Sequence, residues 1–308
     1  MNSLKIVTVA TDSKYYLPYL KESVQNNGAE LVILGYGKEW SGFNLKYSLM
    51  IDYLKTLNNT DIVCFVDGYD VICTRNLKEL PDTFLKLKEM YNCKIIVGED
   101  KMNMGDIMNL ISRNFIYYFF GGTCKERFVN SGTYIGFAND ILNIIKSIYQ
   151  LSNSNTSDDQ IQMKKYCREN KSDFHIDVNS EIFLTMNNPY YDIDNVVKID
   201  KNKNLYYNNS KPFFIHAPAG TFLDNILSKL GYSTDFKIRE QIKNDAFKKY
   251  SMYFSPTFYE NTFGESSIRK YLFIYFIIAI IILVVTFIYM FHKNIKHYTK
   301  HYTKHYKK

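Results

Sequence analysis

The sequence predicts an α/β fold with a mostly parallel central sheet, followed by one C-terminal transmembrane helix. Stretches of strand length alternate with amphipathic stretches of helix length over residues 4–97, which is the element order of a parallel sheet with helical crossovers. The stretch at 62–66 is continuously apolar, as expected of a strand that is covered on both faces. A further uncharged run at 271–291 is long enough to cross a bilayer.

The elements expected over residues 4–97 follow one another without long gaps. Residues 45–57 are typical of the helices, because apolar or aromatic side chains recur at every fourth position from Leu45 to Leu57. In chain order, the predicted strands are 4–10, 30–34, 61–66 and 94–97, and the predicted helices are 16–26, 45–57 and 77–91. Since crossovers between parallel strands are right-handed, Thr11 and Asp67 are expected at the same edge of the sheet.

Two carboxylates, Asp67 and Asp70, follow directly on the strand predicted at 61–66. In open α/β sheets, ligands bind beyond the carboxyl ends of the strands, and hard divalent cations prefer carboxylate oxygens. A cation held there would bridge the phosphates of a nucleotide and offset charge on a leaving group. The pair therefore favours a nucleotide-sugar transferase. A polar turn is the alternative, because Asp and Gly are common in turns for conformational reasons alone.

Further segments of the chain extend this interpretation. They lie at residues 7–11, 34–42, 65–72, 127–138, 158–160, 177–183 and 214–216. In this order they resemble the glycosyltransferase domain of the procollagen lysyl hydroxylases and of related collagen galactosyl- and glucosyltransferases. The resemblance covers residues 4–232 and implies a nucleotide-binding domain of the GT-A type without the hydroxylase domain.

The same resemblance implies that a manganese ion and a UDP-sugar bind at the end of the sheet. The metal ligands would be Asp67, Asp70 and His216. The residues that contact the uridine would be Val9, Thr11 and Trp40. The residues near the diphosphate and the donor sugar would be Lys46, Asp158 and Asp159, and the two aspartates would be needed for transfer.

Residue chemistry alone leaves alternatives open at several of these positions. Asp158 and Asp159 follow a run rich in Ser and Asn, so they also fit the N-terminus of a helix, where acidic side chains are stabilised by the helix dipole. Trp40 lies among glycines, where it would serve either as a platform for a flat ring or as a plug under a loop. Residues 130–132 are expected to form a small-residue loop that enters a strand, in which Gly132 would either let a ligand approach the backbone closely or serve only a tight turn.

A competing metal site starts from His175 and Asp177, with His216 as a distant third ligand. Two histidines and one carboxylate hold iron in some oxygenases. The alternation of strands and helices over residues 4–97 does not fit the β barrel of those enzymes, so this alternative is the weaker one.

The C-terminal part of the chain predicts a membrane anchor. A helix over 271–291 would span roughly 30 Å, the thickness of the hydrocarbon layer, and a lipid bilayer is therefore an expected partner. The tail 292–308 repeats His, Tyr and Lys, and its six lysines account for most of the net charge of +7. It is expected to be attracted to anionic lipid, although histidine-rich tracts also bind metals. Because the rest of the chain is close to neutral, nucleic acid is not an expected partner.

Orientation across the membrane is ambiguous in the sequence. A lone C-terminal span and the lack of an N-terminal signal peptide favour a domain that faces the cytosol, whereas the lysines after the span favour a tail in the cytosol. Sequons at 58–60, 155–157 and 208–210 would be used only in a luminal domain. Five cysteines without paired spacing predict reduced thiols rather than a disulfide framework.

The predicted organisation is a GT-A domain at 1–232, a juxtamembrane segment at 233–270, the span at 271–291 and the tail at 292–308. The predicted function is transfer of glucose or galactose from a UDP-sugar to a protein or glycan acceptor, such as hydroxylysine or galactosyl-hydroxylysine of a collagen-like protein. The alternative is a non-catalytic membrane protein that uses the fold to bind a glycan or a partner. The abundance of Ile, Asn, Lys and Tyr is compatible with an AT-rich genome, such as that of a large DNA virus or a protist.

Overall fold

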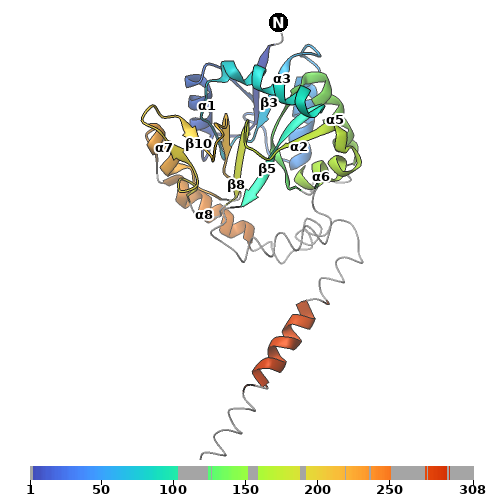
Figure 1. The fold of residues 1–308 in the computed structure, drawn as a ribbon, viewed down its shortest axis with the longest axis vertical. Coiled ribbons are helices and arrows are strands. Elements are labelled where there is room, and N and C mark those ends of the chain that lie inside the picture. The colour runs from blue at the N-terminus through green and yellow to red at the C-terminus, as the bar shows by residue number, and fades with distance from the viewer. Residues whose placement is uncertain are drawn as a thin grey trace, which may run out of the picture.

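A computed structural model of the chain describes residues 3–102, 124–125, 127–151, 159–187, 192–218, 220–235, 237–250, 275, 277–289 and 291. Within these residues, one nine-stranded sheet runs through the molecule (Figure 1). Its strand order is β2-β1-β3-β6-β5-β8-β11-β4, and β7 pairs with β5. The strands are β1 (Leu4–Val9), β2 (Leu31–Leu34), β3 (Ile62–Val66), β4 (Val71–Cys73), β5 (Ile95–Met102), β6 (Val129–Phe137), β7 (Phe174–Asp177), β8 (Phe183–Asn187) and β11 (Phe214–His216). A separate two-stranded ribbon consists of β9 (Lys198–Ile199) and β10 (Leu205–Tyr206).

The sheet is mostly parallel, as predicted. Parallel pairing joins β1 to β2 and β3, β5 to β7 and β8, and β8 to β11. The exceptions are β6, which is antiparallel to both β3 and β5, and β4, which is antiparallel to β11. The loop expected at 130–132 is wrong, because these residues belong to β6 and continue its pairing beside β3. Their small side chains let neighbouring groups approach this strand closely.

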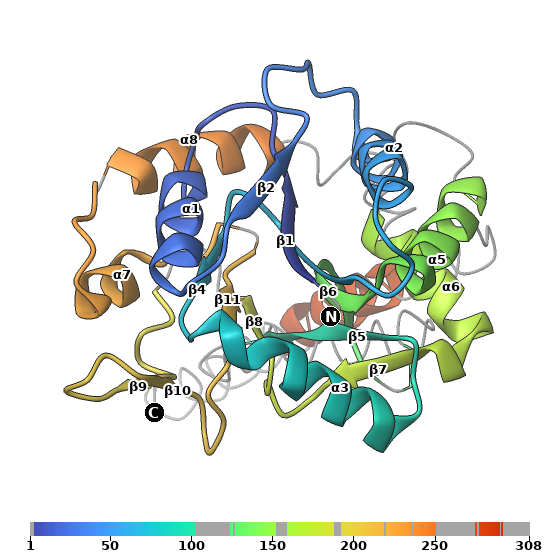
Figure 2. The same cartoon turned by 90° about the horizontal axis from the view of Figure 1, so that it is seen from above.

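Helices cover both faces of the sheet (Figure 2). On one face lie α2 (Phe43–Leu54), α5 (Ala138–Leu151) and α6 (Asp159–Glu169), and on the other lie α1 (Leu17–Asn26) and α3 (Leu80–Tyr91). Short 3₁₀ turns at Leu77–Glu79 and Lys171–Asp173 precede α3 and β7. The helix predicted at 45–57 begins earlier, directly after Gly42, whose φ of 108° suits glycine.

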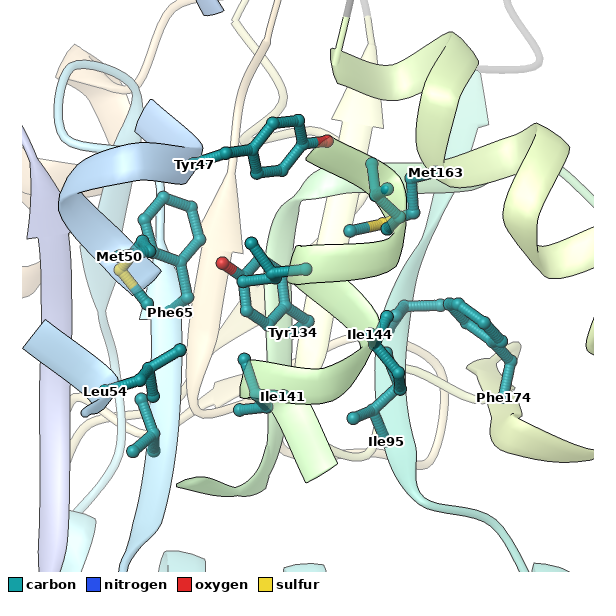
Figure 3. Packing of buried hydrophobic residues seen from close by; sticks show 14 of the residues in the cluster. Tyr47, Met50, Leu54, Phe65, Ile95, Tyr134, Ile141, Ile144, Met163 and Phe174 are labelled. Atoms are coloured by element: carbon teal, nitrogen blue, oxygen red, sulfur yellow. The ribbon is translucent and has the colours of Figure 1, made fainter. Parts of the chain in front are cut away.

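The core divides along the sheet because successive side chains of a strand point to opposite faces. Phe65 packs with α2, α5 and α6, whereas its neighbours Cys64 and Val66 pack with α1 and α3. Figure 3 shows the cluster on the side of α2, α5 and α6. In it the rings of Phe65 and Tyr134 stack with their centroids 4.8 Å apart. Both rings are fully buried, so the polar groups that follow β3 are supported by a well-packed core.

A third cluster lies around β4, β8 and β11, under α7 (Asp224–Leu230) and the start of α8 (Lys237–Tyr250). Helix α8 falls within the predicted juxtamembrane segment 233–270, yet it contacts the domain. Arg239 of this helix pairs with Asp192 at 2.8 Å and with the buried Asp224 at 3.0 Å. The packed part of the chain therefore includes residues beyond 232.

Cysteine pairing differs from the prediction of reduced thiols. Cys124 and Cys167 form a disulfide between the segment before β6 and the last turn of α6. Cys64, Cys73 and Cys93 are free and buried. The partners are 43 residues apart, so their pairing depends on the packing of α6 and leaves no local spacing pattern in the sequence.

The predicted membrane span lies partly outside the described residues. Within 271–291, the structure describes a helix at 275, 277–289 and 291, whose side chains are exposed. Among the described residues, no helix is both long enough and apolar enough to cross a membrane.

Candidate active site

The candidate site forms where β3 ends and the chain turns into β4. Asp67 follows β3, and the turn through Asp70 leads into β4. Strand β11 runs antiparallel to β4 and places His216 opposite Val71. The backbone N–H of Ala217 donates to the carbonyl of Asp70 at 2.8 Å, which closes the pairing at the site. Residues far apart in sequence are thus held at one edge of the sheet.

Asp67, Asp70 and His216 are brought together by this arrangement. Their nearest ligand atoms all lie within 4.8 Å of one another. His216 Nε2 is 3.2 Å from Asp70 Oδ1 and 3.9 Å from Asp67 Oδ2. The ring is buried, and within the described part of the chain neither His216 Nε2 nor Asp70 Oδ1 has a hydrogen-bond partner.

This donor set fits a divalent cation. Two carboxylates and one imidazole nitrogen suit Mn²⁺ and similar ions, and a cation would engage the two buried atoms that lack hydrogen bonds. Burial by itself lowers the pKa of His216, but the carboxylates of Asp70 and Asp67 outweigh it, and the pKa is raised above its ordinary value. The cluster is therefore a strongly cation-attracting point in the sheet edge.

Lys46 lies beneath the cluster rather than at its surface. Its Nζ donates to Asp67 Oδ1 at 2.8 Å and to Asp159 Oδ2 at 2.7 Å, and its side chain is only 5% exposed. The ammonium also sits 4.8 Å above the Phe65 ring. Although burial opposes the charge, Asp159 and Asp67 raise the pKa of Lys46, so it remains an ammonium ion. It links the predicted metal ligand Asp67 to the acidic start of α6.

Asp159 is the first residue of α6, which agrees with its expected place at a helix N-terminus. Its carboxylate is also buried against Lys46, and its backbone carbonyl accepts a hydrogen bond of 2.9 Å from Tyr47. A helix-end position and a position at the site are therefore compatible for this residue. Asp158 lies outside the described residues.

The predicted uridine contacts lie along the neighbouring strand and loops. Val9 ends β1 and is buried, and the Thr11 N–H donates to the Tyr69 hydroxyl at 3.0 Å. Trp40 is 46% exposed and meets Phe43 edge-on, so it is not a plug beneath a loop. Sequence reasoning gave Tyr69 no role, although its position between the two aspartates was a signal that it lies at the site.

Gly132 and Asn130 of β6 lie directly beside the candidate metal ligands Asp67 and His216. The sequence predicted a loop here, in which the glycine would let a ligand approach the backbone or serve a tight turn, but it predicted no contact with His216. A Cβ on Gly132 would lie 2.5 Å from His216 Cε1 and closer still to Asp67 Oδ2, so a side chain there would displace both ligands. Asn130 Oδ1 lies 3.0 Å from His216 Nδ1. The contact between Asn130 and His216 could not be predicted from a local sequence pattern, because it depends on tertiary structure.

The alternative iron site is wrong. His175 stacks on Tyr91 with ring centroids 3.6 Å apart, whereas the Asp177 carboxylate accepts backbone N–H groups of Glu181, Ile182 and Phe183. Among the described residues, the only group of three or more potential metal ligands is Asp67, Asp70 and His216.

Comparison with known proteins agrees with the resemblance seen in the sequence. The chain is 25% identical over 234 residues to the procollagen-lysine,2-oxoglutarate 5-dioxygenase of Drosophila melanogaster, covering 70% of this chain and 30% of that protein. It is 25% identical over 247 residues to the multifunctional procollagen lysine hydroxylase and glycosyltransferase of Caenorhabditis elegans, covering 74% and 32%. The human counterpart LH3 is 27% identical over 247 residues, covering 71% and 30%. The chain thus spans about a third of the length of these relatives.

Among solved structures, a crystal structure of the galactosyltransferase LgtC with donor and acceptor sugar analogues matches with a TM-score of 0.42 and 15% identity, covering 79% of this chain and 95% of that one. The family model described as the PLOD GT domain matches residues 1–232. Because this match spans well over half of the 308 residues, the chain belongs to the PLOD GT domain family of glycosyltransferases.

Proposed function

We propose that this protein is a membrane-anchored, manganese-dependent glycosyltransferase of the GT-A type that transfers a hexose from a UDP-sugar to a protein or glycan acceptor. The observation that carries the proposal is the convergence of Asp67, Asp70 and His216 within 4.8 Å in a member of this family. A module that only binds a glycan would have no need of this set, and loss of at least one ligand would be expected in a decayed site.

The donor in this proposal is UDP-glucose or UDP-galactose. Val9, Thr11 and Trp40 would contact the uridine, and the exposed ring of Trp40 supports this role because a flat base stacks well on an indole. Thr11 and Tyr69 are joined by a hydrogen bond, so the uridine end and the metal end of the donor would lie on one continuous surface.

Asp67, Asp70 and His216 would hold Mn²⁺, which supplies positive charge that offsets the charge on the diphosphate leaving group. Lys46 would orient Asp67 from below through the hydrogen bond that its Nζ donates to Asp67 Oδ1. Asp158 and Asp159 would act near the donor sugar, where a carboxylate stabilises the positive charge that develops on the ring. Because Lys46 is buried between two carboxylates, it would influence the diphosphate through Asp67 rather than by direct contact.

The acceptor, in line with the names of the relatives, would be hydroxylysine or galactosyl-hydroxylysine of a collagen-like protein. The apolar run at 271–291 would anchor the enzyme beside the membrane, and the lysine-rich tail would add attraction to anionic lipid.

The test is hydrolysis of a panel of UDP-sugars by the detergent-solubilised full chain, with and without Mn²⁺. The matched variants are an Asp67→Asn, Asp70→Asn double variant and Asp82→Asn, which removes an exposed carboxylate from α3. We expect Mn²⁺-dependent turnover of one UDP-hexose, its loss in the double variant, and wild-type turnover in the Asp82 variant.

Two results would contradict the proposal in different ways. No turnover together with no calorimetric binding of UDP or Mn²⁺ would favour the non-catalytic alternative. Equal turnover in wild type and double variant would remove Asp67 and Asp70 from the metal site.

A further inference from the structure

Asn130 is a buried polar residue beneath His216. It belongs to β6, the strand between β3 and β5, and only 2% of its surface is exposed. Its amide oxygen lies 3.0 Å from His216 Nδ1, on the side of the ring opposite the carboxylate cluster. The side chain therefore contacts the imidazole at Nδ1 and is not one of the three candidate metal ligands.

The orientation of the Asn130 amide is determined by its other partners. The backbone N–H of Gly132 donates to Asn130 Oδ1 at 2.9 Å, and a backbone N–H can only donate. The atom that faces His216 must therefore be the oxygen and not the nitrogen of the amide. At the other end, Asn130 Nδ2 donates to Gln160 Oε1 at 3.4 Å. Both ends of the amide are thus engaged.

An acceptor at this place decides where the imidazole carries its proton. Asn130 Oδ1 has no proton to give, so His216 Nδ1 must be the donor in the 3.0 Å contact. In the neutral imidazole, Nε2 is then left with a lone pair. That nitrogen is the one that lies 3.2 Å from Asp70 Oδ1, within the group of ligand atoms.

We propose that Asn130 is a positioning residue for metal binding, because it holds His216 in the Nδ1–H tautomer and presents the Nε2 lone pair to the ion. The inference rests on the proposed function, since it assigns a role around the same metal. Groups that accept a hydrogen bond from the distal N–H of a histidine ligand orient the ring and raise its basicity, and their loss weakens metal binding by about 10- to 100-fold.

The experiment measures Mn²⁺ affinity of the full chain without nucleotide, from the electron paramagnetic resonance signal of the free ion. Asn130→Leu removes the acceptor but fills the volume, and we expect its Mn²⁺ affinity to fall about 10- to 100-fold. Asn130→Asp keeps an acceptor for both Gly132 N–H and His216 Nδ1–H, so its affinity is expected to stay at the wild-type level or above it. Thr74→Val loses a hydrogen bond of 2.9 Å to the Pro212 carbonyl, away from His216, and is expected to bind Mn²⁺ as wild type does.

A second measurement needs no variant that must fold. Imidazole ¹⁵N shifts of the metal-free wild-type protein, recorded above the pKa of His216, are expected to show Nδ1 protonated and Nε2 bare. The opposite tautomer would overturn the inference, as would equal Mn²⁺ affinity in wild type and a folded Asn130→Leu variant. Failure of the wild type itself to bind Mn²⁺ would overturn both this inference and the proposed metal site, whereas the first two results would leave the proposed function intact.

Discussion

At the scale of single residues, Lys46 sets the electrostatics beneath the site. One ammonium ion serves two carboxylates, Asp67 and Asp159, in a place where its own side chain is almost completely buried. Removing one partner of a buried ion pair leaves an uncompensated charge, which usually costs 3–5 kcal/mol. The residue is therefore expected to be important for the fold of the site.

We expect Lys46→Met to lower the free energy of unfolding by about 3 kcal/mol, because Asp159 loses its buried counter-ion. Urea denaturation at pH 7, followed by circular dichroism, measures this loss. A Lys46→Met, Asp159→Asn double variant has no unpaired carboxylate at Asp159 and should be more stable than the single variant. A single variant as stable as wild type would show that the ion pairs contribute little.

Gly132 is expected to be required for metal binding, whereas the protein should still fold when it is replaced. In Gly132→Ala the new Cβ would meet Asp67 and His216, so Mn²⁺ affinity should drop about tenfold or more, as it does when ligands lose their orientation. Gly136→Ala is the matched control on the same strand, because its Cβ would meet Ile95 and not the ligands. The control should lose about 1–3 kcal/mol of stability by overpacking and keep its Mn²⁺ affinity.

His175 is expected to make the free energy of unfolding depend on pH. Burial, with a smaller effect of Lys125, lowers the pKa of His175 from 6.5 to about 4. Between these values the unfolded chain takes up a proton that the folded chain does not, so the free energy of unfolding falls as the pH falls from 6.5 to about 4. Melting temperatures of wild type and His175→Gln across this range test the effect. The wild-type curve should drop more steeply on acidification, and parallel curves would refute the prediction.

At the scale of elements, the disulfide joins helix α6 to the segment that precedes β6. Cys167 lies in the last turn of α6, and Asp159 begins the same helix at the site. Closing a loop of 43 residues in the unfolded chain is worth about 4 kcal/mol in the chain-entropy account. The bond therefore stabilises an element that contributes directly to the polar network around Lys46.

We expect reducing agent to lower the urea midpoint of the wild type, with a loss of about 4 kcal/mol in the free energy of unfolding. A Cys124→Ser, Cys167→Ser variant should be less stable and should not respond to reductant, because the other cysteines are free and buried. Insensitivity of the wild type to reductant would show that the bond adds no stability.

The sequence predicted the elements whose information is local. Strands at 4–10 and 61–66 and the helix at 16–26 could be recognised because an apolar run or a helical period is visible within one segment. The position of β6 as an antiparallel strand between β3 and β5 was not predictable in this way, because its pairing with both neighbours depends on tertiary contacts. The disulfide between Cys124 and Cys167 was not predicted for the same reason.

The candidate site shows the same limit. Asp67 and Asp70 stood out because they follow an apolar strand, whereas His216 was assigned by resemblance to a family and not by any local pattern. Asn130 and Lys46 could not be given their contacts from sequence, because those contacts join β6 to β11 and α2 to α6.

At the scale of the whole molecule, α8 closes the third core cluster. Ile238 enters that cluster, and Arg239 neutralises Asp224, which is only 1% exposed. We expect residues 1–250 to unfold at a higher urea concentration than residues 1–232, with a difference of about 3 kcal/mol from the lost buried ion pair.

Arg239→Met within residues 1–250 isolates the ion pair from the rest of the helix and should reproduce most of that difference. Equal midpoints for the two lengths would mean that the packed domain ends at residue 232 and that α8 adds nothing to it.

The pairing of β11 with β4 has a consequence for biosynthesis. Along the chain, β11 is the last strand of the nine-stranded sheet that the structure describes, yet it inserts beside a strand that ends at Cys73. A ribosome must therefore release residue 216 before His216 can meet Asp67 and Asp70. Until then a nascent chain would offer only two of the three candidate ligands, so we expect the proposed metal site to form only after nearly all of the packed domain has been made.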